Sequence, residues 1–265
     1  MAAAPILEIK ALGKRFPARS GREPPPWIIQ DMTFSVGEGE LLTIVGPSGA
    51  GKSTLLNIIA QIEVASAGEI AFGDERFASS EQKSLQPGLN RRIGYVTQDD
   101  NLLPWRTTIE NVLFPHEVQG TLDDKARTQA NELISAVGLS GFENYYPHEL
   151  SGGMRKRAAL IRTLVYDPPI ILMDEPFAAV DAQTRTQLQE DLLRLWSLKR
   201  KTILFVTHDI TEAIALGDRA LVLSRRPSRV AAEHPIPIPR PRNVKDIFTM
   251  PGFAAIYEHI RADVQ

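Results

Sequence analysis

The chain has 265 residues, with 30 Lys and Arg against 32 Asp and Glu and no cysteine. Hydrophobic residues make up 43% and charged residues 23%, a composition that is typical of globular proteins and excludes a wholly disordered chain. This length suits one large domain, or one domain with a modest subdomain, around a sizeable core. Because the formal charge is only −2, no global field draws the chain to nucleic acid or anionic lipid, and we expect no nucleic-acid partner.

The longest segments without charged residues, such as 41–51 and 247–257, are shorter than the roughly 20 residues that a helix needs to cross a bilayer. The N-terminus lacks the basic start, the long apolar run and the small-residue cleavage site of a secretory signal. We therefore expect no transmembrane span and, by default, a cytoplasmic location.

Short strands are predicted first, over 6–12, 27–36 and 40–46, with the polar, proline-rich residues 17–26 between the first two. From Leu41 onward, short apolar runs recur with helical segments between them: LLTIV, RIGYV, IILM, TILFV and ALVL. These runs are apolar at every position, which suits strands that are covered on both faces. We expect a largely parallel α/β core that follows a β-rich opening.

Helical spacing is clearest over 126–137, where apolar residues recur at intervals of three and four. Thr121 with Asp124 three residues later resembles a capping box before this helix, and Gly138 is a plausible stop. Two more helices are expected over 154–165 and 188–196. The tail from Arg225 is rich in Pro and Arg, and predicts a short strand, an extended segment and an amphipathic piece near Ile247 to Ile260.

Residues 46–54, called here the phosphate loop, match the pattern G-x-x-x-x-G-K-[ST] directly between the apolar run LLTIV and the helical run LLNII. Glycines let the backbone curl so that its N–H groups point inward, at the positive end of the following helix. The loop is expected to bind nucleotide phosphates, with Lys52 reaching the β- and γ-phosphates and the Ser53 hydroxyl binding Mg²⁺. Its residues are Gly46, Pro47, Ser48, Gly49, Ala50, Gly51, Lys52, Ser53 and Thr54.

The apolar run IILM ends in Asp174 and Glu175, at the carboxyl end of a predicted buried strand. This is the edge at which α/β sheets bind ligands. We expect Asp174 to help hold Mg²⁺ and Glu175 to polarise the water that attacks the γ-phosphate. Such a pair is more often solvated surface when it stands alone, but here a phosphate loop precedes it.

The segment LSGGM, 150–154, precedes a predicted helix. Ser151, Gly152 and Gly153 at a helix start leave backbone N–H groups available, and glycine permits close approach, so they predict a second anion site. Alone, Ser-Gly-Gly is a common helix-entry turn. Between a phosphate loop and a strand that ends in Asp-Glu, it is close to diagnostic.

The order of these motifs resembles the nucleotide-binding subunit of an ABC transporter over nearly the whole chain. The matching segments are GPSGAGKST, Gln98 after IGYVT, LSGGM, IILMDEP, AAVD at 178–181, and His208 after TILFVT. The resemblance implies an α/β fold of the P-loop NTPase (RecA-like) class, with a mainly parallel core, an N-terminal antiparallel β subdomain and an inserted α-helical subdomain at roughly 103–165. It implies an ABC-type ATP-binding domain over 1–240 and a C-terminal extension over 241–265.

The resemblance also assigns roles to single residues. Glu175, His208, Gln98 and Lys52 are the expected catalytic residues, with Gln98 sensing the γ-phosphate and Mg²⁺ and His208 holding the γ-phosphate near Glu175. Asp181 lies where the family has its D-loop, and Phe16 where it places an aromatic ring against adenine. Trp27 competes with Phe16 for that place, and simple packing or surface roles are the plain alternatives for Gln98, His208 and Phe16.

In the resembled family, two chains bind head to tail. Each copy would offer Ser151 and Gly153 to the ATP held by Lys52 of the other, and hydrolysis would let the two copies part. The implied cofactors are ATP and Mg²⁺. The implied partners are a second ATP-binding subunit, a transmembrane permease and, through the complex, an extracytoplasmic solute-binding protein, which places the chain at the cytoplasmic face of the cell membrane.

A narrower resemblance is carried by QDDNLLPWRTTIENV, DEPFAAVDAQTR and HDITEAIALGDRALVLSRRPSRV, which look like importer ATPases of the nitrate, sulfonate, taurine and bicarbonate group. It implies that Leu102, Leu103, Pro104 and Trp105 form part of a groove for the coupling helix of the permease, although core packing of this segment is equally compatible with the sequence. The family often has glutamine where Lys156 stands, a departure that removes no phosphate ligand.

Three alternatives remain open at this point. One is an ABC cassette for lipid trafficking or export, because cargo is chosen by the permease and the binding protein. Another is a P-loop kinase, which has no use for LSGG or His208. The third is a non-transport ABC protein that acts on DNA or ribosomes, which typically carries a long coiled coil or two cassettes in tandem. The basic residues Arg225, Arg226 and Arg229 suit a solvated turn, with lipid or regulatory contact as the alternative.

Overall fold

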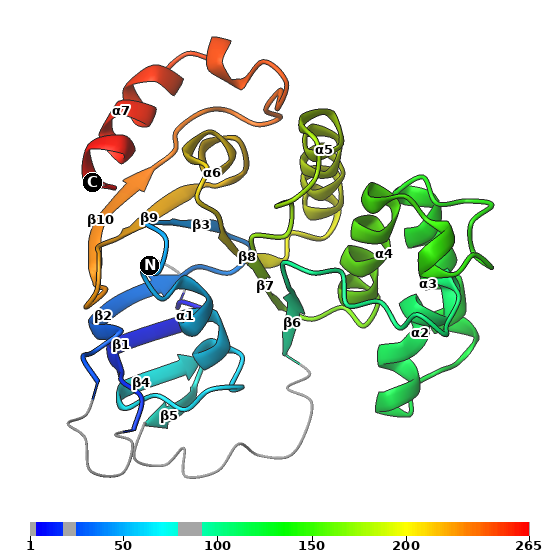
Figure 1. Cartoon of the computed structure of the whole chain (residues 1–265), viewed down its shortest axis with the longest axis horizontal. Helices are drawn as coiled ribbons and strands as arrows, with labels where there is room; N and C mark the ends of the chain where they lie inside the picture. Colours follow the sequence, from blue (N-terminus) through cyan, green and yellow to red (C-terminus); the bar gives the residue numbers. More distant parts are fainter. Residues whose placement is uncertain (1–3, 18–24, 79–91, 265) are drawn as a thin grey trace. The chain divides into compact units, whose positions relative to one another are not determined.

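The computed structural model describes residues 4–17, 25–78 and 92–264, and the chain divides into two compact units (Figure 1). The first unit consists of residues 1–90 and 201–265, and the second of residues 91–200. Most of the proline-rich segment predicted between the first two strands lies outside the described residues.

An antiparallel sheet opens the first unit, as expected. Its four strands lie in the order β2-β1-β4-β5, and every neighbouring pair is antiparallel. Their bounds are Leu7–Lys14 (β1), Ile29–Val36 (β2), Ala67–Phe72 (β4) and Glu75–Ala78 (β5). The sequence analysis missed β4 and β5 because charged residues and a glycine break up their short apolar runs.

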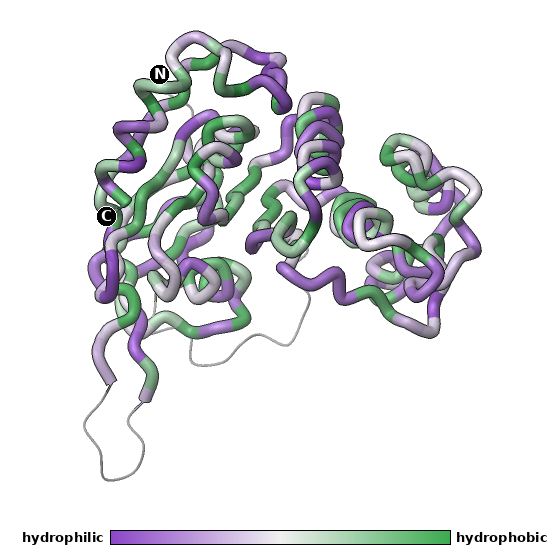
Figure 2. Tube along the Cα trace, turned by 45° about the horizontal axis from the view of Figure 1, so that its top comes forward, coloured by the Kyte–Doolittle hydropathy of each residue, from purple (hydrophilic) through white to green (hydrophobic). Residues whose placement is uncertain are grey.

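The parallel part of the first unit is built around β3, which pairs in parallel with β8 on one side and β9 on the other. An antiparallel strand, β10, continues the sheet beyond β9. The bounds are Leu41–Val45 (β3), Thr202–Val206 (β8), Arg219–Leu223 (β9) and Val230–Pro235 (β10). Every residue of β3 and β8 is buried, as their continuous apolar runs predicted, and Figure 2 shows hydrophobic stretches along these strands.

The described residues of the first unit form three helices: α1 (Lys52–Ile59), α6 (Ile210–Leu216) and α7 (Phe253–Asp263). The predicted amphipathic piece near the C-terminus is divided into a short 3-10 turn at Ile247–Thr249 and α7, which buries Phe253 and Ile260.

The Pro/Arg-rich tail before α7 folds onto the first unit. Arg242 is buried and donates to the carbonyl oxygens of Ile214 (2.7 Å), Ile236 (3.0 Å) and Ile238 (3.0 Å). Arg240 forms a 2.7 Å ion pair with Asp218. These two arginines therefore hold the tail in place and add little to the charge of the surface.

The second unit is mostly helical. Its two strands, β6 (Ile93–Val96) and β7 (Ile170–Asp174), pair in parallel. Its helices are α2 (Thr108–Gln119), α3 (Asp124–Ala136), α4 (Gly152–Leu164) and α5 (Ala182–Lys199), with a 3-10 turn at Pro147–Glu149. The helices predicted over 126–137, 154–165 and 188–196 are confirmed as α3, α4 and α5.

The predicted cap of α3 was wrong. The Asp123 carboxylate, and not Thr121, accepts the backbone N–H of Ala126 at 2.7 Å and begins the helix. The N–H of Thr121 instead donates to the His116 carbonyl at 2.8 Å, in the turn that ends α2. The stop was right: Gly138 follows the helix with a φ of 69°.

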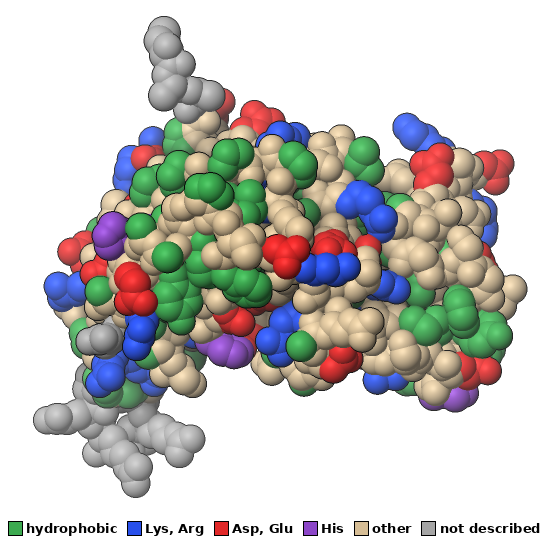
Figure 3. Space-filling model, turned by 90° about the horizontal axis from the view of Figure 1, so that it is seen from above, with side chains coloured by type: hydrophobic (Ala, Val, Ile, Leu, Met, Phe, Trp, Pro, Cys, Tyr) green, Lys and Arg blue, Asp and Glu red, His purple; other side chains and the backbone are tan. Residues whose placement is uncertain are grey.

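Acidic and basic side chains are interspersed on the face of the molecule drawn in Figure 3, in keeping with the near-zero net charge. In the described part of the chain, no helix is both long enough and apolar enough to span a bilayer.

Candidate active site

The phosphate loop joins β3 to α1 in the first unit. Gly49 and Gly51 have φ angles of 78° and 85°, a region that glycine adopts without strain. A Cβ at Gly51 would also lie 2.8 Å from Cγ2 of Ile28. Helix α1 begins at Gly51 with no side-chain cap and no acidic residue in its first turn. The backbone therefore offers the N–H groups and the positive helix end that an anion needs.

Lys52 carries the cation of this loop. Its side chain is buried, 6% exposed, and Nζ donates to the carbonyl oxygens of Gly46 (2.9 Å) and Pro47 (3.2 Å). The ammonium group is thus held over the loop backbone rather than extended into solvent. Ser53, the next residue, is exposed.

His208 also belongs to the first unit, just after β8. The N–H of Thr207 donates to the Ile44 carbonyl at 3.1 Å, so the end of β8 lies beside the end of β3, from which the phosphate loop starts. The Thr207 hydroxyl donates to Glu212 at 2.5 Å and accepts from the N–H of Asp209 at 3.0 Å. These bonds fix the backbone on both sides of the exposed His208.

Two aromatic residues were considered for adenine, and their surroundings differ. Phe16 is 42% exposed, with the Lys14 ammonium 5.0 Å from its ring centre. Trp27 is half-buried against Gly13, where a Cβ would lie 2.9 Å from the indole, and the Arg15 guanidinium covers its ring at 4.8 Å. Both rings therefore have a cation over them, and Phe16 is the more exposed of the two.

In the second unit, Gln98 lies two residues beyond β6 and is exposed. Its backbone carbonyl accepts a hydrogen bond from Nζ of Lys156 on α4. The neighbouring turn is closed by the Thr97 hydroxyl, which donates to the Asp99 carbonyl at 2.8 Å and accepts from the Asn101 amide at 2.7 Å.

Asp174 ends β7, and Glu175 follows it in a left-handed conformation with a φ of 44°, which is uncommon for a residue other than glycine. Both side chains are half-buried. Burial, together with the charge of Asp174, raises the pKa of the Tyr95 phenol on β6. The Asp174 carboxylate therefore lies near a phenol that stays neutral.

The second anion site is the start of α4. The Ser151 hydroxyl accepts the N–H of Met154 at 3.3 Å, and Ser151 and Gly152 are exposed. A Cβ at Gly153 would lie 2.7 Å from Cγ2 of Thr184 in the first turn of α5. Glycine is thus required at 153 because the starts of α4 and α5 nearly touch.

Asp181 caps α5 by accepting the N–H of Thr184 at 2.9 Å. Hydrogen bonding by the side chain and the backbone of Thr184 lowers the pKa of the Asp181 carboxyl. The same Thr184 contacts both Gly153 and Asp181, so the second unit brings residues 150–154, called here the signature, together with Asp181 at the D-loop position.

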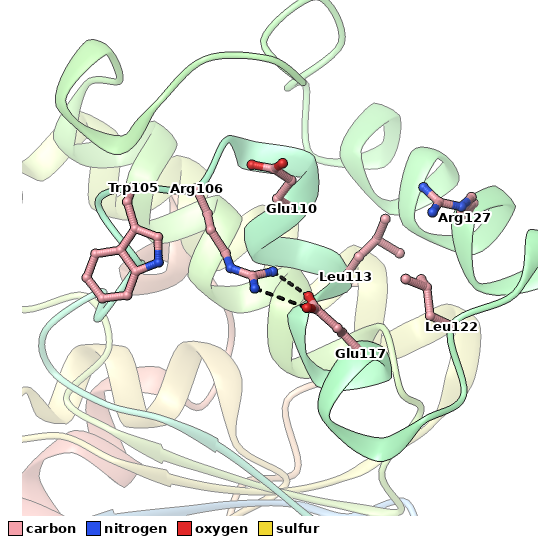
Figure 4. A pocket seen from close by; sticks show the side chains of 7 residues that line it. All are labelled: Trp105, Arg106, Glu110, Leu113, Glu117, Leu122 and Arg127. Atoms are coloured by element: carbon pink, nitrogen blue, oxygen red, sulfur yellow. Dashed lines mark hydrogen bonds and ion pairs between the residues drawn. The ribbon is translucent and has the colours of Figure 1, made fainter.

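The predicted docking cluster is only partly exposed. Trp105 is 71% exposed, whereas Leu102 is buried at 8%, so of the two alternatives core packing holds for Leu102 and exposure holds for Trp105. A cavity of about 490 Å³ opens beside Trp105 (Figure 4). Its lining residues are Trp105, Arg106, Glu110, Leu113, Glu117, Leu122 and Arg127, and the Arg106 guanidinium forms a paired hydrogen bond with the Glu117 carboxylate.

Sequence reasoning missed several supporting residues. Thr184 has no motif of its own, and its importance follows only from its contact with Gly153. Arg226, in the turn between β9 and β10, was expected to be solvated; it is exposed, but its Nε also donates to the Gly49 carbonyl of the phosphate loop at 2.5 Å. Such contacts join residues far apart in the chain, which no local pattern reports.

Comparison with known proteins is consistent with this arrangement. The family model described as ABC transporter matches residues 29–178. The chain belongs to the ABC transporter family. It is an ATP-binding cassette of the ABC type and an ATP hydrolase. The two alternatives, a P-loop kinase and a non-transport ABC protein, are not favoured.

Similar cassettes come from several sources. The aliphatic sulfonates import ATP-binding protein SsuB of Bacillus cereus is 38% identical over 239 residues, 89% of each chain. The taurine import ATP-binding protein TauB of Rhizobium johnstonii is 39% identical over 261 residues, 97% of this chain and 95% of TauB. A dimeric ATP-binding cassette in a post-hydrolysis state, bound to ADP and Pi, has a TM-score of 0.73 at 32% identity, over 87% of this cassette and 98% of that chain.

Proposed function

We propose that this cassette is the ATP-hydrolysing subunit of an importer for a small anion or organosulfur solute of the nitrate, sulfonate or taurine type. The single observation that carries ATP binding is the phosphate loop, in which a buried Lys52 lies over a backbone that offers uncapped N–H groups at the start of α1. The solute class is supported by the names of similar cassettes, which import aliphatic sulfonates and taurine. Those names favour import over lipid trafficking or export.

The phosphate loop would bind ATP through its backbone amides and Lys52, and Phe16 would stack on the adenine. Ser53, Asp174 and Gln98 would hold Mg²⁺, because hydroxyl, carboxylate and amide oxygens are the ligands it prefers. Within the described residues, no cluster of three or more His, Asp or Glu side chains forms a metal site by itself. A cation shared with substrate phosphates fits this donor set, and it would neutralise charge on the triphosphate.

Hydrolysis needs a base and a group that holds the γ-phosphate. The Glu175 carboxylate would accept a proton from the attacking water while the water oxygen bonds to the γ-phosphorus and the bond to the β-γ bridging oxygen breaks. His208 would hold the γ-phosphate at the end of β8, and Lys52 would stabilise charge that develops on the leaving ADP.

The signature would act on a second molecule of the cassette. Ser151, Gly152 and Gly153 of one copy would contact the γ-phosphate bound by the phosphate loop of the other, and Asp181 would border that contact. ATP bound between two positive helix ends favours the closed pair, and loss of the γ-phosphate removes that preference. The dimeric cassette with ADP and Pi, similar in fold, is a precedent for such a pair.

The pair would work on a transmembrane permease at the cytoplasmic face of the membrane, with an extracytoplasmic solute-binding protein delivering the solute. The cavity beside Trp105 would receive a helix of the permease, since an exposed indole beside Leu113 and Leu122 offers apolar contact and Glu110 and Arg127 offer charge contacts. We assign the ATP-binding domain to 1–240, with its helical subdomain at roughly 103–165, and the C-terminal extension to 241–265.

Glu175→Gln tests the proposal most directly. We expect the variant to bind ATP but to hydrolyse it at least about a hundredfold more slowly, because a general base typically contributes 10²- to 10⁴-fold. The variant should form a dimer when ATP and Mg²⁺ are added, measured by sedimentation. Glu132→Gln, an exposed glutamate of α3, is the matched control and should behave as wild type. Undiminished phosphate release by Glu175→Gln would remove Glu175 from its catalytic role.

A further inference from the structure

Helix α4 begins with the signature, and one of its faces lies along residues 98–101, called here the Gln98 segment. Two arginines of that helix bind the segment. Arg155 donates from Nε to the Asp100 carboxylate at 3.1 Å, and Arg162 donates to the backbone carbonyls of Asp100 (2.9 Å) and Asn101 (2.7 Å). The end of the segment formed by Asp100 and Asn101 is therefore fixed to α4.

At the other end of the segment, Gln98 is bonded to α4 through the side chain of Lys156. Its Nζ donates to the backbone carbonyl of Gln98, the residue proposed to sense nucleotide. Lys156 is half-buried, and burial lowers the pKa of its ammonium group while the Asp100 and Asp99 carboxylates oppose that shift. The bond from Lys156 to Gln98 is thus charge-assisted, the stronger kind, and is partly shielded from water.

The other side of α4 is fixed as well. The Arg157 guanidinium pairs with the Asp191 carboxylate of α5 at 2.9 Å, and Asp191 is only 3% exposed. Gly153 meets Thr184 at the start of α5. A displacement of the signature must therefore carry α4 with it, and the Gln98 segment follows as far as its bonds to α4 hold.

We propose that Lys156 is a positioning residue that transmits the state of the signature to Gln98. This inference rests on the proposed function, in which the signature engages ATP of a second copy and Gln98 senses the γ-phosphate. When the signature is engaged, the Lys156 bond holds the Gln98 backbone in register with α4. The stretch that follows, 102–105, runs to the cavity at Trp105, so the same bond links nucleotide engagement to the surface proposed to receive the permease.

The length and charge of the side chain matter for this role. A glutamine at this position would be shorter and uncharged, so its hydrogen bond to the same carbonyl would be weaker. This cassette therefore holds Gln98 more tightly to α4 than a glutamine would, and Lys156→Gln should have an intermediate effect.

The test uses the full-length Glu175→Gln protein, with ATP and Mg²⁺ as the probe. Hydrogen exchange of the peptide that covers 97–104 is compared with and without ATP, and dimer formation is followed by sedimentation. In the parent we expect ATP to slow exchange of this peptide. Adding Lys156→Met should leave the dimer intact but reduce that ATP-induced protection by about five- to tenfold, the range expected for one charge-assisted hydrogen bond.

Two matched variants separate positioning from folding. Lys156→Arg keeps the charge and reach and should restore the protection, whereas Lys125→Met, an exposed lysine of α3, should leave it unchanged. If Lys156→Met folds poorly, Lys156→Gln replaces it in the comparison. The inference is overturned if the ATP-induced protection is unchanged in the Lys156→Met variant, or if Lys156→Arg fails to restore it. Failure of the parent to form a dimer with ATP instead contradicts the proposed function.

Discussion

Two helix starts in this cassette are proposed to bind anions, and their surroundings differ. Neither α1 nor α4 has an acidic residue in its first turn, whereas α2, α3 and α6 have Glu110, Asp124 and Glu212 there. An acidic residue stabilises a helix start but repels a phosphate. Helices α5 and α7 also lack an acidic residue there, so this absence leaves the starts of α1 and α4 open to an anion but does not by itself mark a site.

The starts of α1 and α4 each have a cation in the first turn, and the two cations are held differently. Lys52 lies buried over the phosphate loop, while Arg155, in the first turn of α4, donates to the Leu150 carbonyl at 2.7 Å and pairs with the Asp100 carboxylate. The charge of Arg155 is therefore shared with a carboxylate of the Gln98 segment, whereas Nζ of Lys52 contacts the phosphate loop itself. We infer that the phosphate loop binds ATP without help from a second copy. The signature would then contact a phosphate that the phosphate loop of the other copy already holds.

Removing the cation of the phosphate loop should have the largest effect. Lys52→Ala should weaken ATP binding by about a hundredfold, because it deletes charge-assisted contacts to two phosphates. Equilibrium binding of ATP, measured by calorimetry, checks the value, and a thermal melt checks that the variant folds. Binding equal to wild type would contradict the assignment of the phosphate loop.

The close approach at the start of α4 gives the next effect. Gly153→Ala places a Cβ 2.7 Å from Cγ2 of Thr184 and should cost about 2 kcal/mol of folding stability, typical of overpacking. Adding Thr184→Ser removes Cγ2 and should recover most of the loss. Gly152→Ala is the control, because a Cβ there meets nothing closer than Arg155 Nη2 at 4.0 Å. Thermal unfolding of the four proteins decides the matter, and equal losses at 152 and 153 would refute the steric explanation.

These two sites also show what the sequence predicted well. The phosphate loop and the signature are each a contiguous stretch, so their letters predicted where each begins, and the runs at 41–45 and 202–206, apolar except for one threonine each, predicted buried strands. Local pattern failed where a partner comes from elsewhere in the chain. No motif placed Thr184 beside Gly153, and the sequence left open whether Leu102 packs in the core or lies on the surface, because its neighbours come from other segments of the chain.

The tail illustrates the same limit of local pattern. The sequence predicted an extended Pro/Arg-rich segment but gave no contact for Arg242, which donates to the carbonyls of Ile214 in α6 and of Ile238 in the tail itself. The helix cap at Asp123 was missed for a simpler reason: Thr121 and Asp123 are both good capping residues, and a pattern alone does not choose between them.

Replacing the cap of α4 should have a smaller effect than overpacking the start of that helix. Ser151→Ala removes the acceptor for the Met154 N–H and should cost about 1 kcal/mol of stability, as an N-cap does. Asp123→Ala, which removes the equivalent cap of α3, should cost a similar amount and is the matched control. Only Ser151→Ala should weaken ATP-dependent dimerisation of the Glu175→Gln protein. Equal dimerisation in both variants would mean that Ser151 only caps α4 and does not contribute to the dimer.

The smallest effect concerns the adenine end of the site at the phosphate loop, a feature for which the start of α4 has no counterpart. Phe16→Ala should weaken ATP binding by about fivefold, since stacking of two aromatic systems contributes about 1 kcal/mol beyond burial. Affinity for inorganic triphosphate, which has no base, should stay unchanged because Lys52 and the loop amides are untouched. Phe248→Ala, an exposed aromatic of the C-terminal extension, controls for loss of surface apolar area. An equal loss for both ligands would mean that Phe16 supports the fold and does not contact adenine.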